Sequence, residues 1–564
     1  MRVRMRSGCC RSARLTALLV LLTLLAAACR AGADGSGGDA ALSGVAAADR
    51  QAYEPYDEPV TMRIAYRYSD ITLPQGDTND NNFLTRYLSK KTGINVKYAW
   101  EANDEDQYNS KLALSILSGD LPDAFVAGRE QFRQLVRNNM LEDLTEVYPA
   151  YASTLVKSIY EATGGKALDD ASVDGKLYGL PNVAIEADAP SYVWVRQDWL
   201  DRLRLEPPRT ASDIAWIAKA FAESDPDGNG KADTIGIPLS STLLYDEKMG
   251  LSGLNSVFAA FGAYPRHWVE GSDGGIVYGS IAPEAKQALS LVADWYRDGV
   301  IDRKFALRKE PDELIKSNQA GLFFGPWWAP YYPLSASVQN DTKAEWRVFA
   351  APLDASGSFN VSTAPSTDRY LVIRKGYPHP EAALKLLNAF TKIERNVDTD
   401  EQDLHALNET AEQMGVQLRN YYPFDLLLDH PDAVVRRHDS LVLALEGKTE
   451  PELLDVETRR LYDSAILEQE SPRKNMEAWS ASQAYLLGGA VSKTSQTMKQ
   501  SLFFGTTPTM SERWDELRKL EQETYLKIIT GELPVEAFDR FAADWKASGG
   551  DRITREVAGA IGRR

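Results

Sequence analysis

The feature that most constrains the fold is an alternation of strand and helix patterns early in the chain. The segment VTMRIAY (60–66) alternates apolar and polar residues as a strand does, and NNFLTRYLSKKTG (81–93) has helical periodicity and ends in glycine. A strand INVKYAW (94–100), a helix YNSKLALSILSGD (108–120) and an apolar strand within LPDAFVAG (121–128) follow. Because strands that alternate with helices of 10–15 residues form βαβ units, this region predicts an α/β fold with a largely parallel sheet.

The rest of the chain continues this pattern and then becomes helical. An amphipathic helix is expected at 283–301, strands between 346 and 376, and mostly helices from about residue 380 onward. Trp199, Trp295 and Trp545 occur at helical spacing among apolar neighbours, which predicts core positions.

Ligands of such sheets bind at the carboxyl ends of the strands. The first segments to examine are therefore 67–70 and 128–130, which directly follow predicted strands.

The charge and the motifs narrow the classes of function. Of 564 residues, 63 are Lys or Arg and 80 are Asp or Glu, so the net charge of −17 repels phosphate backbones and excludes nucleic acid as a partner. The chain has no HExxH zinc motif, G-x-S-x-G elbow or G-x-x-x-x-G-K-[ST] phosphate loop. The sequence therefore predicts a protein that is not an enzyme. Because 80 acids always contain some suitably spaced pair, a polysaccharide-degrading enzyme is the alternative.

The N-terminus has the pattern of an export signal. Residues 1–14 carry five arginines and no acid, and the uncharged segment 15–28 reaches only ~21 Å, short of the ~30 Å bilayer core. Small residues lead into Cys29, as in a bacterial lipobox, which predicts removal of residues 1–28 and lipidation of Cys29. An ordinary cleaved signal and an uncleaved anchor are the alternatives.

Cleavage changes what the composition means. It removes the five arginines, which brings the net charge to −22, and leaves Cys29 as the only cysteine of the mature chain. Residues 29–57 are small and polar without apolar periodicity, so they are expected to form a flexible tether.

The segment DPDGNGKAD (225–233) has the spacing of a calcium loop. Oxygen donors fall at positions 1, 3, 5 and 9, a glycine at position 6 and a backbone carbonyl at position 7. Position 12 is Gly236, where an EF-hand has a bidentate glutamate. We predict a structural Ca²⁺; a plain loop is the alternative. The predicted ligands are Asp225, Asp227, Asn229, Lys231 and Asp233.

The cluster GPWWAP (325–330) differs from the other aromatic positions. Its two prolines and its glycine indicate a loop, and two adjacent tryptophans in a loop cannot both point into one core. At least one of Trp327 and Trp328 is therefore expected to line a cleft, where an indole face suits a sugar ring.

A series of motifs then resembles one family along nearly the whole mature chain. The motifs are KKTGINVKY, LSGDLPDAFV, DGKLYGLP, VRQDWLDRL, DPDGNGKAD, GPWWAP, FFGTTPTMSERW and GELPVEAFDRF. In this order they resemble bacterial extracellular solute-binding proteins (family 1, maltose/oligosaccharide type), specifically the large lipoproteins of carbohydrate ABC importers. Related alginate-type members bind calcium in a loop like 225–233.

The resemblance implies an α/β fold of the two-lobe periplasmic-binding-protein type (type II). Mixed sheets flanked by helices form each lobe, and a hinge joins the lobes. The N-terminal lobe would comprise residues 58–183 and 357–440, and the C-terminal lobe residues 184–356 and 441–564, with a helical C-terminal region.

The resemblance also implies ligand-binding residues. The tryptophan of the GPW motif stacks on sugar in this family, which points to Trp327 with Trp328 beside it, and a C-terminal Met-Ser-x-x-Trp motif points to Trp514. The family's other contacts correspond to Glu186, Tyr68 and Asp70, for which hinge or cap roles are the alternative. A tryptophan expected near residue 127 is replaced by alanine, with Arg129 following, which predicts a different glycan and hints at a charged one.

The resulting prediction is a non-enzymatic, lipid-anchored and monomeric receptor on the extracellular face of the bacterial cell membrane. It would capture an oligosaccharide between its lobes and deliver it to ABC importer permease subunits. The alternatives are the surface-anchored degrading enzyme and a sensory or peptide-binding member of the same fold.

Overall fold

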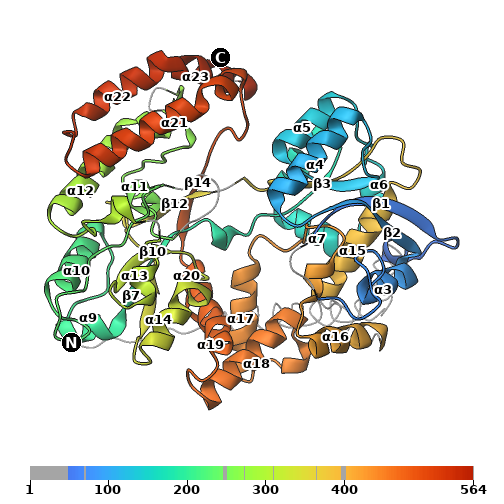
Figure 1. The fold of residues 1–564 in the computed structure, drawn as a ribbon, viewed down its shortest axis with the longest axis horizontal. Coiled ribbons are helices and arrows are strands. Elements are labelled where there is room, and N and C mark those ends of the chain that lie inside the picture. The colour runs from blue at the N-terminus through green and yellow to red at the C-terminus, as the bar shows by residue number, and fades with distance from the viewer. Residues whose placement is uncertain are drawn as a thin grey trace, which may run out of the picture.

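The computed structural model describes residues 49–68, 72–244, 251–271, 274–308, 310–363, 365–395 and 402–562. The predicted signal segment, Cys29 and Asp70 lie outside these residues. The described chain forms two α/β lobes side by side, with strands and helices connecting them (Figure 1).

The first lobe is built on a five-stranded mixed sheet of order β2-β1-β3-β13-β6. Its strands are β1 (Val60–Arg67), β2 (Ile94–Ala102), β3 (Ala124–Gly128), β13 (Arg369–Ile373) and β6 (Leu180–Pro181). The predicted parallel pairing holds for β1, β2 and β3, whereas β13 runs antiparallel to β3 and β6. The expectation of a largely parallel sheet is therefore right for the three strands closest in sequence.

Helices cover both faces of this sheet. They are α3 (Phe83–Thr92), α4 (Glu105–Ser118), α5 (Arg129–Arg137), α6 (Val147–Tyr151), α7 (Thr154–Ala162), α8 (Lys166–Asp170), α15 (Glu381–Arg395) and α16 (Gln402–Met414). The short hairpin of β4 (Ser172–Val173) and β5 (Lys176–Leu177) precedes β6.

Local sequence explains why α3 begins and ends where it does. The Asn82 side chain accepts hydrogen bonds from two backbone N–H groups of the first turn, at 3.0 Å each. Gly93 ends the helix at φ 70°, and a side chain there would lie 2.8 Å from the backbone of Tyr56. The predicted helix end at Gly93 is confirmed.

The second lobe has a smaller antiparallel sheet of order β10-β7-β11. Its strands are β7 (Tyr192–Arg196), β10 (Leu322–Gly325) and β11 (Trp346–Phe349), and β8 (Trp268–Glu270) pairs with β9 (Ile276–Tyr278). Its helices are α9 (Gln197–Leu203), α10 (Ala211–Glu223), α11 (Asn255–Ala259), α12 (Pro283–Arg297), α13 (Glu313–Lys316), α14 (Ser335–Asn340), α21 (Pro508–Ile529), α22 (Ala537–Trp545) and α23 (Asp551–Ala560). Trp199, Trp295 and Trp545 are buried here, as predicted.

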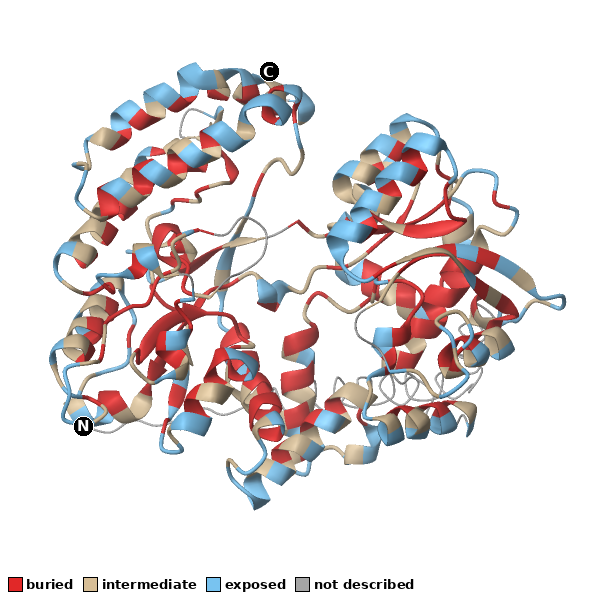
Figure 2. Ribbon diagram, in the orientation of Figure 1, coloured by how far each residue is buried: buried red, intermediate tan, exposed pale blue. Residues whose placement is uncertain are grey.

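The lobes have separate hydrophobic cores. The first core draws on residues 62–183 and 370–428, and the second on residues 193–351 and 510–557. Buried residues follow the strands and the inward faces of the helices in both lobes (Figure 2). The exact lobe boundaries given above stay a prediction.

Several segments pass between the lobes. The chain crosses after β6, again before β13, and a third time before α17, while β12 (Phe359–Thr363) and β14 (Gln496–Gln500) pair in parallel between the two bodies (Figure 1). Helices α17 (Ala433–Leu445), α18 (Val456–Glu470), α19 (Met476–Gln483) and α20 (Ala490–Ser492) lie below them. A third buried cluster joins α17 and α18 to Tyr192 and Phe359, so these helices pack mainly with the second lobe. Among the described residues, no helix combines the length and hydrophobicity that crossing a membrane requires.

Candidate functional site

A pocket of about 380 Å³ opens at the carboxyl ends of β1 and β3 in the first lobe. This is the place where the predicted α/β topology puts a ligand, and the volume is at the lower end of the range for small-molecule sites. Three arginines and four acidic residues are among its lining residues. The charged lining residues are Arg67, Arg129, Arg369, Glu105, Glu130, Asp368 and Asp425.

Arg129 is held at the pocket by fixed partners. It is the first residue of α5, and its guanidinium lies 2.8 Å from the carboxylate of Asp170 and donates to the carbonyl of Thr367. The hydroxyl of Tyr370 donates to the same carboxylate at 2.6 Å, and burial raises the pKa of this hydroxyl. The Arg129 side chain is 13% exposed, so its position is largely set before any ligand arrives.

Arg67 and Arg369 share one carboxylate. Both guanidinium groups contact Asp425, the second at 2.5 Å, and Arg369 also lies 3.5 Å from Glu105. Arg67 ends β1 and Arg369 begins β13, whereas Asp425 comes from the irregular segment before α17. Three distant parts of the sequence therefore meet at this edge of the sheet.

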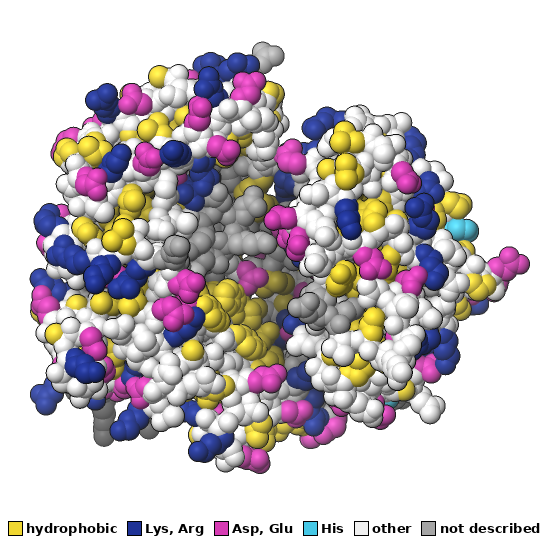
Figure 3. Space-filling view, in the orientation of Figure 1, with side chains coloured by type: hydrophobic (Ala, Val, Ile, Leu, Met, Phe, Trp, Pro, Cys, Tyr) yellow, Lys and Arg dark blue, Asp and Glu magenta, His cyan; other side chains and the backbone are white. Residues whose placement is uncertain are grey.

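The second lobe reaches this pocket through the segment after β14. The backbone N–H of Thr506 donates to Glu130 at 3.0 Å, and the Arg129 guanidinium lies 6.0 Å from the centre of the Phe504 ring. The molecular surface is hollowed between the lobes, and hydrophobic side chains gather in the lower part of the hollow (Figure 3). The pocket thus lies on a side of the first lobe that the second lobe contacts.

The two tryptophans of the GPWWAP loop have different surroundings. Trp327 is only 8% exposed, donates from Nε1 to Asp188 at 2.8 Å and packs edge-on against Tyr485. Desolvation raises the pKa of Asp188, and the hydrogen bond from Trp327 opposes this rise. Trp328 is half-buried and packs against the same third buried cluster that contains Trp327. It is therefore more accessible than Trp327.

This difference predicts separate effects of two substitutions. Trp327→Ala is expected to lower the free energy of unfolding by about 3–5 kcal/mol, because it removes a buried indole. Trp328→Ala is expected to weaken sugar binding about tenfold, or roughly 1.4 kcal/mol, with a smaller stability loss. Denaturant unfolding and equilibrium binding of both variants check this. Equal stability losses with unchanged affinities would contradict the assignment.

The other predicted ligand residues lie apart from one another. Tyr68 follows Arg67 directly, and its ring stacks on Tyr66 at 6.0 Å. Glu186 lies in the segment that crosses between the lobes after β6, at the start of the short helix η1 (Glu186–Asp188). Its side chain is exposed, and its backbone N–H donates to the Pro431 carbonyl at 2.8 Å. Trp514 lies on α21 and stacks on Trp268 at 6.4 Å, beside the second core.

Among the predicted ligand residues that the structure describes, Arg129 is the one that lines the pocket. The roles of Trp327, Trp328, Trp514, Glu186, Tyr68 and Arg129 toward a sugar stay predictions. The sequence did not predict that Arg369, Asp425 and Glu105 line the pocket. The pairing of β13 with β3 and the position of residue 425 beside this sheet are set by tertiary contacts, which leave no local sequence pattern.

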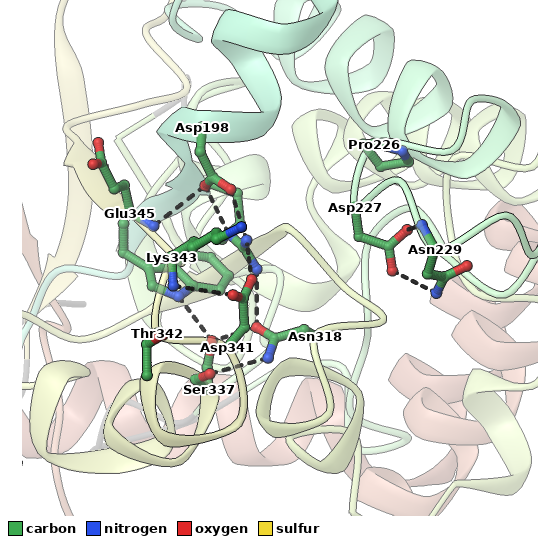
Figure 4. Close-up of polar contacts among 12 residues, drawn as sticks. Asp198, Pro226, Asp227, Asn229, Asn318, Ser337, Asp341, Thr342, Lys343 and Glu345 are labelled. Carbon is green, nitrogen blue, oxygen red and sulfur yellow. Dashed lines mark hydrogen bonds and ion pairs between the residues drawn. The ribbon is translucent and has the colours of Figure 1, made fainter.

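The predicted calcium loop is a tight turn rich in carboxylates. The Asn229 side-chain amide donates to Asp227 at 2.7 Å and to Asp233 at 3.1 Å, and the Gly230 N–H donates to Asp225 at 2.9 Å (Figure 4 shows Asp227 and Asn229). Within the described part of the chain, none of the three carboxylates pairs with a Lys or Arg. Desolvation and the neighbouring Asp225 raise the pKa of Asp227, while the contact between the two carboxylates lowers that of Asp225.

The donor chemistry of this loop fits Ca²⁺, which prefers carboxylate, amide and carbonyl oxygens. In the described ranges, however, no three Asp, Glu, His or Cys side chains converge closely enough to hold a metal ion. A side chain at Gly236, position 12 of the loop, would lie 1.9 Å from the Val300 carbonyl oxygen, so a twelfth-position glutamate cannot be accommodated.

A second charged cluster of the second lobe surrounds Arg196, whose guanidinium has hydrogen-bond and ion-pair partners within the protein. The buried Arg196 lies 2.7 Å from Asp198, 2.8 Å from Asp341 and 2.9 Å from Asn318. Figure 4 labels these three partners. The partners of Arg196 join β7, α9 and α14, so the cluster stabilises the second lobe.

The fold and the pocket define a two-lobed α/β binding protein whose polar site lies at strand ends facing a second lobe. The chain belongs to the family of bacterial extracellular solute-binding proteins, whose sequence profile matches residues 84–410. The predicted family and fold class are confirmed.

Two of the similar proteins are named as an ABC transporter subunit and as a glycan-binding protein, and a third is named as a lipoprotein. The fructooligosaccharide ABC transporter substrate-binding protein FusA of Streptococcus pneumoniae is 29% identical over 262 residues, 44% of this chain and 46% of FusA. The polygalacturonan/rhamnogalacturonan-binding protein YtcQ of Bacillus subtilis is 23% identical over 488 residues, 84% of this chain and 87% of YtcQ. Lipoprotein LipO of B. subtilis is 30% identical over 252 residues, 43% of this chain and 46% of LipO. The chain spans about half the length of FusA and LipO.

Solved structures share the fold. An extracellular solute-binding protein from Bifidobacterium longum subsp. infantis matches with a TM-score of 0.60 at 15% identity. The match covers 89% of this chain and 98% of the Bifidobacterium chain. A solute-binding protein for HMO from B. longum infantis has a TM-score of 0.57 at 14% identity, with coverages of 90% and 99%.

Proposed function

We propose that this chain is the lipid-anchored receptor of a carbohydrate ABC importer, which captures an oligosaccharide between its lobes and delivers it to the permease subunits. The pocket at the ends of β1 and β3, lined by arginines and carboxylates and reached by the second lobe, is the observation that carries the proposal. Support also comes from the family and from FusA and YtcQ, whose names describe a fructooligosaccharide transporter subunit and a pectic-polymer-binding protein.

The pocket offers the chemistry that sugar hydroxyls need. The arginine N–H groups donate to hydroxyl and ring oxygens, and the carboxylates accept from hydroxyl groups. Trp328, with its neighbour Trp327, would stack on a sugar ring, and Tyr68, Asp70, Glu186 and Trp514 are further contacts in the proposal. Closing of the lobes on the sugar shifts the population toward a form that docks on the permease.

The remaining features of the proposal follow from the sequence. Cys29 carries the lipid and the segment from residue 29 to 48 forms the tether, so the folded lobes lie on the extracellular face of the cell membrane as a monomer. Residues 49–57, which the sequence assigned to the tether, instead pack on the first lobe: Ala52 is buried, and Lys385 donates to the carbonyls of Gln51 and Glu54. The protein returns its ligand intact and is not an enzyme, and its acidic surface binds no nucleic acid.

A screen of oligosaccharides tests this function. We expect at least one oligosaccharide to raise the melting temperature by several degrees, because a ligand that binds only the folded state stabilises it. Chromatography of the incubated sugar should show no new reducing ends. Release of shorter sugars would favour the degrading enzyme, and stabilisation by peptides alone would favour a peptide-binding member of the fold.

We further propose that the loop of residues 225–233 binds a structural Ca²⁺. Asp225, Asp227, Asn229 and Asp233 would supply side-chain oxygens and Lys231 its backbone carbonyl. Three carboxylates in one short turn without a basic partner repel one another, and a divalent cation would relieve this repulsion.

Calcium is therefore expected to stabilise the second lobe. At 100 times its dissociation constant, an ion gives about 2.7 kcal/mol, which corresponds to roughly 5–10 °C for a lobe of this size. Melting curves in 2 mM Ca²⁺ and in excess chelator check this. The double substitution Asp225→Asn, Asp227→Asn should abolish the difference in melting temperature between the two conditions. Wild-type curves that coincide in Ca²⁺ and in chelator would refute calcium binding by this loop.

A further inference from the structure

The charges of the pocket are balanced within the protein. Three arginines and four carboxylic acids line it, so its lining has a formal charge of −1. Each arginine is already in contact with a carboxylate: Arg129 with Asp170, and both Arg67 and Arg369 with Asp425. Among the described residues that line the pocket, positive charge is therefore not in excess.

A hydroxyl group and a carboxylate make different demands on such a surface. A hydroxyl both donates and accepts, so it can bridge an arginine and its carboxylate without breaking the pair. A sugar carboxylate only accepts, and it would have to compete with Asp425 for the same guanidinium groups while lying beside other acids. The balanced lining therefore favours an uncharged ligand, in contrast to the charged glycan at which Arg129 hinted in the sequence.

Asp425 is the residue on which this balance depends. Its single carboxylate contacts two guanidinium groups from different strands, and its side chain is 41% exposed at the pocket rim. It lies in an irregular segment outside the sheet, where a substitution leaves the sheet hydrogen bonds intact.

We propose that Asp425 is a specificity-determining residue that selects uncharged oligosaccharides over uronic acid oligosaccharides by neutralising Arg67 and Arg369. This rests on the proposed function, because it names the class of sugar for the same site. Removal of the Asp425 charge leaves Arg67 without this partner and Arg369 beside Glu105 at 3.5 Å, so that Arg67 above all can pair with a sugar carboxylate in a bidentate manner.

Matched sugars and matched variants test the proposal. Two probes are compared. The first is the oligosaccharide that most stabilises the wild-type protein, and the second is its counterpart that differs only at C6, where one of the two sugars carries a hydroxymethyl group and the other a carboxylate. Both are titrated into wild type, Asp425→Asn and Asp425→Ala at low salt and at 0.5 M NaCl. Asp120→Asn is the control, because Asp120 is 78% exposed, lies 4.0 Å from Arg63 and is not among the residues that line the pocket.

We expect wild type to prefer the uncharged sugar. Both Asp425 variants should bind the uronate roughly tenfold or more tightly than wild type does, and this gain should shrink in high salt. The Asp120 variant should match wild type.

Two results would overturn the inference. They are a wild-type preference for the uronate, and Asp425 variants whose uronate affinity equals that of wild type. Both leave the receptor function standing, whereas a wild-type protein that binds no oligosaccharide of either kind overturns the proposed function itself.

Discussion

Arg129→Met is expected to weaken oligosaccharide binding at least 100-fold while the protein stays folded. The guanidinium is presented to the pocket by Asp170 and the Thr367 carbonyl, so it can donate to a sugar without reorganising. Hydrogen bonds from a charged donor contribute about 1.5–3 kcal/mol each, and the loss of two corresponds to a factor of 100 or more. Asp170 keeps its hydrogen bond from Tyr370, which limits the effect on stability.

Two variants separate this effect from a change of net charge. Arg129→Lys keeps the charge but loses the planar fork, so its affinity should be intermediate. Arg86→Met removes an arginine on α3 that pairs with Asp77 at 2.8 Å and does not line the pocket, so its affinity should equal that of wild type. Calorimetric titration measures all three, and wild-type affinity in Arg129→Met would remove the pocket from the ligand site.

Glu521→Ala is expected to lower the free energy of unfolding by about 3–5 kcal/mol, as much as the loss of the buried Trp327 indole. Glu521 is 1% exposed on α21, accepts from Arg266 at 2.9 Å and accepts from the hydroxyl of Tyr278 at 2.9 Å. Alanine leaves the buried Arg266 charge without this carboxylate and Tyr278 without this acceptor, and both changes are costly in a low-dielectric interior.

An exposed ion pair on the same helix supplies the control. Glu516 contacts Arg513 at 2.9 Å, but both side chains are more than half exposed, so Glu516→Ala should cost less than about 1 kcal/mol. Urea unfolding measures both variants, and sugar affinity at a temperature where both are folded should be unchanged, because neither residue lines the pocket. A loss below 1 kcal/mol for Glu521→Ala would contradict the buried pair.

Local sequence signals were sufficient for much of the first lobe. Asn82 and Gly93 mark the ends of α3, and apolar runs mark β1, β2 and β3, because capping and periodicity act over a few residues. The direction of β13 could not be predicted in this way, since antiparallel pairing with β3 depends on contacts between residues more than 240 positions apart.

The candidate site was predictable only in part. Residues 67 and 128–130 follow strands whose carboxyl ends must meet, which is why Arg67 and Arg129 could be located in advance. Asp425 and Arg369 are brought to the pocket by tertiary packing, which no local sequence pattern predicts. The GPWWAP loop predicted that at least one of Trp327 and Trp328 lines a cleft, but not which one. The hydrogen bond of Trp327 to Asp188 and its contact with Tyr485 make Trp328 the more accessible of the two.

Calorimetric titration of the wild-type protein with the oligosaccharide selected by the screen tests the central claim most directly. We predict saturable heat at one sugar per chain, a negative heat-capacity change from surface buried between the lobes, and full recovery of the intact sugar. Heat that continues after one equivalent and accompanies sugar breakdown would show an enzyme. The absence of any heat from every oligosaccharide would contradict a sugar receptor.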